Sequence, residues 1–176
     1  HGTETVTVTR DTRMVQGVPT AVVHDVTTGK GGRVTEDADD FYAQDAAGNV
    51  WQFGHQTTTY DGRPDTGGSW EAGVDGAEAG LVMAATPRVG DGYQREYAAG
   101  VAEDRVEVLS LEEQRSVPAG VFGDLVQTED TSVLEPGLVQ RRYYAEGLGL
   151  LYVENVAGSS GIRELVDVTP AGAAAR

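Results

Sequence analysis

The three histidines are the residues with the most distinctive chemistry in this chain of 176 residues. His24 and His55 each fall in a segment of β-branched and aromatic residues, and His1 begins the sequence. An acidic run from Glu36 to Asp45 lies between His24 and His55. Imidazole nitrogens and carboxylates together bind divalent transition metals, and a carboxylate beside an imidazole orients it as a general base. Which chemistry is available depends on the elements that carry these side chains.

Apolar and polar residues alternate with a period of two through most of the chain, which is typical of β-strands. Clusters of glycine, asparagine, aspartate and serine separate these segments at the spacing of about 8–12 residues expected of an antiparallel meander. Strands are expected at 3–9, 18–28, 34–44, 50–60, 93–97, 105–109, 114–117, 121–129, 138–144, 150–155 and 162–168.

These segments predict an all-β fold, a strongly curved antiparallel meander that forms a half-barrel or partly closed barrel of about 9–11 strands. The glycine-rich stretch near 71–87 is expected to be a short helical or loop crossover that ends at Pro87. Residues 1–170 are predicted to form a single β-rich domain, and 171–176 a flexible tail. Curved sheets commonly leave a groove on the concave side.

The hairpin that turns through 45–49 brings the strand of His55 alongside the acidic run. If Gln44 faces Val50 across this turn, then Asp39 faces His55. Side chains alternate along a strand, so both residues share a face with a group of aromatic residues that marks the inward side. These aromatic residues are Phe41, Trp51 and Phe53.

The preceding hairpin, which turns through 29–32, places His24 opposite Asp37. Both histidines are therefore expected to point inward beside Asp37 and Asp39. The predicted metal ligands are His24, Asp37, Asp39 and His55, with His1 as a further ligand through its α-amine and ring. The alternatives are a hydrogen-bonded Asp–His pair that fills a polar position in the core, and an Asp–His general base.

The chain contains no cysteine, so a metal would have only nitrogen and oxygen ligands. Zinc or copper is expected ahead of calcium, because the acidic run lacks the ordered ligand spacing of a calcium loop. Aromatic and arginine residues are candidates for contacts with a small ligand, although aromatic residues at strand spacing also commonly fill a core. The candidates are Phe41, Trp51, Phe53, Tyr97, Arg141 and Tyr143.

With 28 acidic and 13 basic residues the chain carries a net charge of −15, which argues against a nucleic-acid partner. No apolar run is long enough for a membrane span, and the common hydrolase, P-loop and dinucleotide motifs are absent from the sequence. The composition favours an exported bacterial protein, either extracellular or in the cell envelope.

Four blocks of sequence resemble a family of largely uncharacterised secreted bacterial proteins and lipoproteins. The blocks are Phe41-Tyr42-Ala43-Gln44-Asp45, Gly48–Gly54, Gly68–Ala77 and Tyr143–Leu150. The last block is also similar to the closing hairpin of lipoprotein carriers of the LolA and LolB type. The resemblance extends from residue 20 to residue 155 and implies an exported protein with a ligand-holding half-barrel. It supplies no catalytic residues, and the chain departs from it at His55, where that family tends to have an acid.

Three functions remain open on the sequence alone. The first is a secreted binding module that holds a small apolar or amphipathic ligand. In the more specific version of this hypothesis, the module binds a divalent metal. The second is an enzyme that uses an Asp–His pair, such as a cyclase, an isomerase or a metal-assisted hydrolase. The third is a cell-surface interaction domain without a small-molecule site. The sequence does not specify the oligomeric state.

Overall fold

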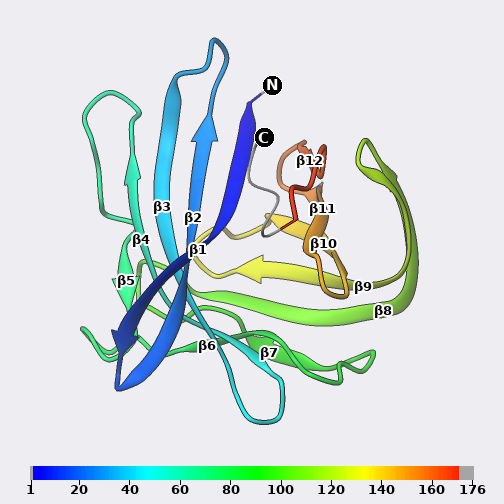
Figure 1. Ribbon diagram of the computed structural model, residues 1–176, viewed down its shortest axis with the longest axis horizontal. Helices are drawn as coiled ribbons and strands as arrows, with labels where there is room; N and C mark the ends of the chain where they lie inside the picture. The colour runs from blue at the N-terminus through cyan, green and yellow to red at the C-terminus, as the bar shows by residue number, and fades with distance from the viewer. Residues whose placement is uncertain (1, 171–176) are drawn as a thin grey trace. The chain divides into compact units, whose positions relative to one another are not determined.

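The computed structural model describes residues 2–170, which form two antiparallel sheets of six strands each (Figure 1). Within this range there is no helix, and therefore none that is long and apolar enough to cross a membrane. The all-β, antiparallel prediction is confirmed. The helical form of the crossover is wrong, because short strands and turns occupy that stretch.

The first sheet is built from the N-terminal half of the chain. Its order is β1-β2-β3-β4-β5, and β6 also pairs with β4. The strands are β1 (Thr3–Val15), β2 (Val18–Thr28), β3 (Val34–Gln44), β4 (Val50–Thr59), β5 (Trp70–Glu71) and β6 (Gly80–Met83).

The second sheet has the order β12-β11-β10-β9-β8-β7. The two expected strands at 105–109 and 114–117 are parts of one long strand, β8. The strands are β7 (Gly92–Gln94), β8 (Asp104–Val117), β9 (Gly120–Ser132), β10 (Val139–Ala145), β11 (Gly149–Ala157) and β12 (Ile162–Glu164).

Neither sheet is closed or strongly curled, so the predicted half-barrel is not formed. Closure needs the first and last strands of a sheet to pair, whereas β1 and β12 each pair with one neighbour in the part of the chain described. The strands are divided between two sheets instead of being bent into one.

The chain divides into two compact units. Among the described residues, the first contains 2–86 together with Tyr93–Arg105, and the second contains Pro87–Gly92 and 106–170. Each unit has its own apolar cluster, around Phe41 in the first and around Leu125 in the second. The single-domain arrangement stays a prediction, and the expected tail, 171–176, lies outside the described residues.

The crossover after β5 folds as consecutive tight turns because several of its residues have left-handed backbone conformations. Gly73, Asp75 and Gly76 have φ values of 86°, 51° and 81°. Positive φ interrupts a right-handed helix and suits glycine. The amide of Gly73 donates to the carbonyl of Ala77 at 2.8 Å, which closes the turn.

Gly80 brings another segment of the first unit against the sheet. A Cβ atom at this position would lie 1.9 Å from the carbonyl oxygen of Arg95, so only glycine allows the two backbones to approach so closely. Because Gly80 pairs with Gln52 on β4, this approach sets Arg95 and Glu96 beside β6 and close to β4.

Candidate functional site

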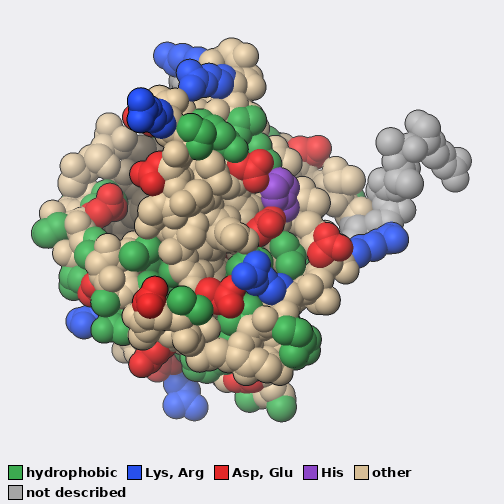
Figure 2. Space-filling view, turned by 90° about the vertical axis from the view of Figure 1, so that its left-hand side faces the viewer, with side chains coloured by type: hydrophobic (Ala, Val, Ile, Leu, Met, Phe, Trp, Pro, Cys, Tyr) green, Lys and Arg blue, Asp and Glu red, His purple; other side chains and the backbone are tan. Residues whose placement is uncertain are grey.

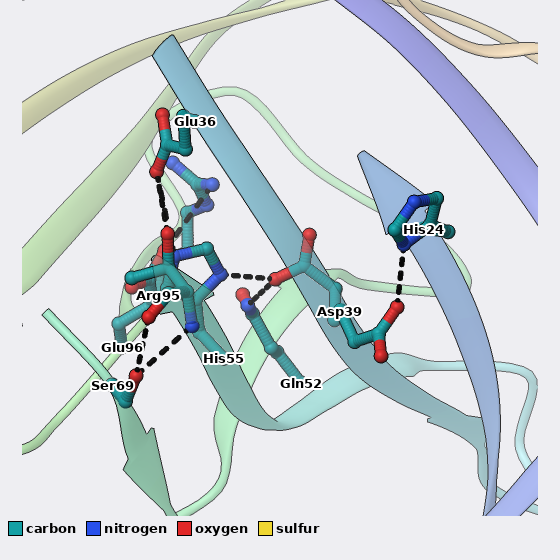
Figure 3. A network of polar contacts seen from close by, with 10 residues as sticks. His24, Glu36, Asp39, Gln52, His55, Ser69, Arg95 and Glu96 are labelled. Atoms are coloured by element: carbon teal, nitrogen blue, oxygen red, sulfur yellow. Dashed lines mark hydrogen bonds and ion pairs between the residues drawn. The ribbon is translucent and has the colours of Figure 1, made fainter. Parts of the chain in front are cut away.

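Two Asp–His pairs lie on the first sheet (Figure 3). The Nδ1 atom of His24 on β2 is 2.8 Å from Oδ1 of Asp39, and Nδ1 of His55 on β4 is 2.8 Å from Oδ1 of Asp40. Asp39 and Asp40 are consecutive residues of β3, so their side chains project to opposite faces of the sheet. The two histidines are therefore on opposite faces.

The predicted pairing of β3 with β4 is correct near the turn and wrong beyond it. Ala43 faces Trp51 as expected, but past Tyr42 the register shifts, and Phe53 is left as a bulge residue. His55 consequently faces Asp40 and not Asp39. A shift of one residue moves a side chain to the other face of the sheet, which is why the expected grouping fails.

The pairing of β2 with β3 shifts by two residues, so His24 stays on its predicted face. The amide of Gly29 donates to the carbonyl of Arg33, and Thr35 is left without a Cα partner on β2. His24 therefore faces Asp39, while Asp37 lies diagonally, with its Oδ1 atom 3.8 Å from Nε2 of His24.

The predicted metal ligands are thus divided between two faces. His24, Asp37 and Asp39 lie on one face, and His55 lies on the other. Among residues 2–170, no group of three or more histidine, aspartate or glutamate side chains has the arrangement of a metal site. His1 lies outside the described residues.

The bulge at Phe53 creates a polar site around His55 that the sequence analysis missed. Gln52 and His55 are three residues apart and would point to opposite faces of a regular strand. With the bulge between them, both reach the same carboxylate oxygen of Asp40, each at 2.8 Å. Gln52 is only 2% exposed. We refer to Asp40, Gln52 and His55 as the His55 site.

Acidic groups surround the His55 site. Oε1 of Glu36 is 4.0 Å from Nε2 of His55 and accepts a hydrogen bond of 2.9 Å from the hydroxyl of Thr57. Arg95 and Glu96 form an ion pair of 3.3 Å, and both side chains are largely buried. Figure 3 shows this pair and Glu36 on the same side of the sheet as His55.

The buried polar atoms of this region include an acceptor and a donor that have no hydrogen-bond partner among the described residues. They are the acceptor Oε1 of Gln52 and the donor Nε1 of Trp70, which faces His55 from β5. Native proteins pair the great majority of such atoms with protein, water or a ligand. Gln52 therefore offers the site an unsatisfied acceptor, and Trp70 an unsatisfied donor.

The pKa values of both histidines are raised. The hydrogen bond to Asp39 makes the largest contribution at His24, where the carboxylates of Asp37, Asp39 and Asp25 add to it. Burial lowers the pKa of His55, but the hydrogen bond to Asp40 and the nearby carboxylates outweigh it; these carboxylates belong to Asp40, Glu96 and Glu36. Both sites favour the protonated imidazole.

Ser69 also carries a hydroxyl in this region, but this hydroxyl bonds to the backbone of Thr57 and does not complete a catalytic triad. Its Oγ atom accepts a hydrogen bond from the amide of Thr57 and donates one to the carbonyl of the same residue. The Asp40–His55 pair is able to hold an imidazole in position for proton transfer or for hydrogen bonding to a ligand.

The opposite face of the sheet carries a more exposed polar group around His24. Arg13 reaches Gln56 at 3.3 Å and lies 4.6 Å over the ring of Phe41. The His24 side chain is 38% exposed, and its ion pair lies in solvent contact. Acidic side chains, in red, are spread over the face of the molecule that Figure 2 draws.

The residues predicted to contact a ligand have several different surroundings. Phe41 is 2% exposed in the core of the first unit, where Phe53 packs against its cluster. Trp51 donates its indole N–H to Asp45, and Tyr97 pairs with Glu78 in an isolated bridge.

In the second unit, Tyr143 is fully buried under the guanidinium of Arg115. Arg141 lies 3.7 Å from Glu129. A ligand contact by any of the six predicted residues stays a prediction.

The members of the His55 site that the sequence analysis missed are Asp40 and Gln52. A glycine inside an otherwise regular strand often marks a bulge, and Gly54 is that signal here. Nothing in the sequence indicates that Arg95 would reach β6. No family model, curated protein or solved structure matches this chain.

Proposed function

We propose that this protein is an exported, non-catalytic binding module whose His55 site holds a small amphipathic amine. The observation that carries the proposal is the unpartnered Oε1 of Gln52, a buried acceptor held beside Asp40 and His55. A buried acceptor without a partner is unfavourable, and a donor from a ligand would remove that cost.

Charge supports the choice of an amine. The His55 site is surrounded by Glu36, Asp40 and Glu96, and Arg95 is the cation that accompanies them. Oε1 of Glu36, which is 4.0 Å from Nε2 of His55, is a carboxylate oxygen that attracts a cationic donor. An ammonium group donates to it and carries the complementary charge.

An apolar surface beside the charged groups supports an amphipathic ligand. Trp70 faces His55 from β5, and the buried Ala38 lies on the same face of the sheet as Asp40. The unpartnered Nε1 of Trp70 adds a donor at the boundary between the polar and apolar groups. Export rests on the composition and on the family resemblance given above.

Titration with n-alkylamines from ethylamine to octylamine, followed by calorimetry and by amide chemical shifts, tests the proposal. We expect binding that strengthens with chain length, and shift changes centred on β3, β4 and β5. The variants His55→Asn and Gln52→Leu should each weaken binding by about tenfold. Matching n-alkanols should bind more weakly than the amines.

His24→Asn is the matched control, because His24 makes the same Nδ1 contact with the adjacent aspartate on the other face. It should leave amine binding unchanged. Equal weakening by His24→Asn and His55→Asn would refute the site, as would failure of any amine to bind. Unfolding curves for each variant separate lost binding from lost folding.

An enzyme is the second candidate, and the Asp40–His55 pair is the observation that favours it. Here Asp40 would orient the imidazole, and Nε2 would take or give the proton. Mass spectrometry of a bound amine recovered after prolonged incubation separates the two functions. An unchanged mass supports the binding module, and a conversion that His55→Asn abolishes supports the enzyme.

A further inference from the structure

The sequence contains three Asp-Gly pairs, at 61–62, 75–76 and 91–92. In such a pair the amide nitrogen of the glycine can attack the side-chain carboxyl carbon of the aspartate, because glycine has no Cβ atom to obstruct the approach. The attack needs a carboxyl group and an amide without other partners, and a backbone that can rotate to bring them together. The surroundings of each pair therefore determine whether it reacts in the folded protein.

The first pair, Asp61–Gly62, lies in the loop that follows β4 and projects beyond the end of that strand (Figure 1). Both residues are exposed. Neither the carboxylate of Asp61 nor the amide of Gly62 has a hydrogen-bond partner among residues 2–170. Thr59 and Asp65 close the base of the loop through two backbone hydrogen bonds of 2.8 and 3.0 Å. The loop thus has a fixed base, while the two reacting groups at its tip are free.

The second pair, Asp75–Gly76, forms the centre of a closed turn. The amide of Ala77 donates to the carbonyl of Val74 at 2.9 Å, and the amide of Gly73 donates to the carbonyl of Ala77 at 2.8 Å. Asp75 and Gly76 have φ values of 51° and 81°, as in a type I′ turn. The attack requires rotation about the Cα–C bond of Asp75, and the two hydrogen bonds that span the pair restrict that rotation.

The third pair, Asp91–Gly92, has an aspartate whose polar groups are already bonded. Its Oδ2 atom accepts a hydrogen bond of 2.9 Å from the amide of Arg88. The amide of Asp91 donates to the carbonyl of Arg88 at 3.0 Å, and its carbonyl accepts from the amide of Val108 at 2.9 Å. Movement of this side chain toward the nitrogen of Gly92 would break the bond from Arg88, and rotation of the backbone would break the bond from Val108.

We infer that Asp61 is a site of spontaneous isomerisation to isoaspartate in the folded protein, whereas Asp75 and Asp91 are protected by their turns. The nitrogen of Gly62 loses its proton and bonds to Cγ of Asp61, and a carboxyl oxygen leaves as water, which gives a cyclic succinimide. Water then opens the ring at either carbonyl and yields aspartate or isoaspartate, so only water is needed as co-reactant. The inference does not depend on the His55 site or on its ligand.

Peptide mapping of the full chain after prolonged incubation at neutral pH tests the inference. Chromatography separates the isomeric peptides, and electron-transfer fragmentation distinguishes isoaspartate from aspartate of equal mass. In the folded chain we expect isoaspartate to form at position 61 at least about tenfold faster than at 75 or 91. In guanidinium chloride the three rates should agree within about threefold, because unfolding removes the turns and each aspartate precedes a glycine.

Asp61→Glu is the matched variant, because the longer side chain would have to close a larger and less favourable ring. It should abolish the modification at this position and leave the rates at 75 and 91 unchanged. Its unfolding curve should match that of the wild-type chain, since the Asp61 carboxylate makes no hydrogen bond to another described residue.

Absence of isoaspartate at 61 in the folded chain, or formation at 75 or 91 as fast as at 61, would overturn the inference. A tenfold difference that persists in guanidinium chloride would also overturn it, because the neighbouring residues and not the fold would then determine the rates. Modification of the same peptide in Asp61→Glu would assign the reaction to another residue and refute the site.

Discussion

Asp39 and Asp40 are neighbours in one strand, yet each holds the Nδ1 atom of a different histidine at 2.8 Å on opposite faces of the sheet. Asp39 forms the exposed pair with His24. Asp40 belongs to the largely buried site with His55 and Gln52. The two pairs have the same chemistry in different surroundings. Each is therefore a control for the other.

The raised pKa values of His24 and His55 make stability depend on pH. A folded-state pKa above the ordinary histidine value of 6.5 means that the folded protein binds the proton more tightly than the unfolded chain does. This contribution is fully present below about pH 6.5 and is lost as the pH rises through the raised pKa. Urea unfolding at about pH 5.5 and about pH 8.5 should therefore show lower stability at the higher pH.

The double variant His24→Gln and His55→Gln separates the histidines from other titrating groups. It should show a smaller loss of stability between the two pH values than the wild-type chain. An equal loss in both proteins would assign the pH dependence to other residues. Histidine proton shifts followed by NMR report the two pKa values directly.

Substitution of Gly80 by alanine should destabilise the first unit by about 2–4 kcal/mol, because the added Cβ would lie 1.9 Å from the carbonyl oxygen of Arg95. Backbone atoms on both sides would have to move. Gly123→Ala is the control, since a Cβ there meets open space, and it should change stability by less than about 0.5 kcal/mol. Similar losses for the two variants in chemical denaturation would contradict the close approach.

Asp45 organises the turn between β3 and β4 and should make it sensitive to acid. Its carboxylate accepts hydrogen bonds from Trp51 and Asn49 side chains and from the amides of Asn49 and Ala47, and its pKa is lowered from 3.8 to about 2. The stabilisation is present above the unfolded-state pKa of 3.8 and is lost as the pH falls through about 2.

The variant Asp45→Asn should be less stable than wild type at neutral pH and should lose less stability on acidification. Thermal unfolding at a series of acidic pH values checks both statements. Parallel curves for the two proteins would show that Asp45 does not carry the acid sensitivity.

Removal of the Tyr143 hydroxyl should destabilise the second unit by about 1–3 kcal/mol. The hydroxyl accepts hydrogen bonds from Arg115 and Gln127 and donates one to Glu154, and the side chain is fully buried. In Tyr143→Phe the ring stays in place while these partners lose their contact. Chemical denaturation measures the loss, and a change below about 0.5 kcal/mol would mean that the partners find each other or water.

The strands were predictable because their signals are local. The alternation of apolar and polar residues predicted most strands of the first sheet. The turn at Asp45–Asn49 predicted how β3 and β4 pair next to that turn. The helical option for the crossover failed because the positive φ values at Gly73 and Gly76 are compatible with turns and not with a helix.

The His55 site was not predictable at the same level because it depends on a single bulge. The register derived from the turn is correct as far as Tyr42 and then changes by one residue at Phe53. Gly54 signals a bulge, but the glycine does not specify the residue at which the extra position falls. The predicted half-barrel was wrong for a related reason. The alternation of residue types within one strand does not indicate which distant strand it pairs with.

The bulge at Phe53 also makes the site insensitive to one kind of change in chain length. Without Phe53, Gln52 and His55 would be two positions apart in an unbulged strand and would still share a face. Loss of Phe53 would remove its packing against the apolar cluster but would keep both contacts with Asp40. We therefore expect homologues that have one residue fewer between Gln52 and His55 to keep the same geometry. In a sequence alignment, a one-residue gap at this position would be compatible with an intact site.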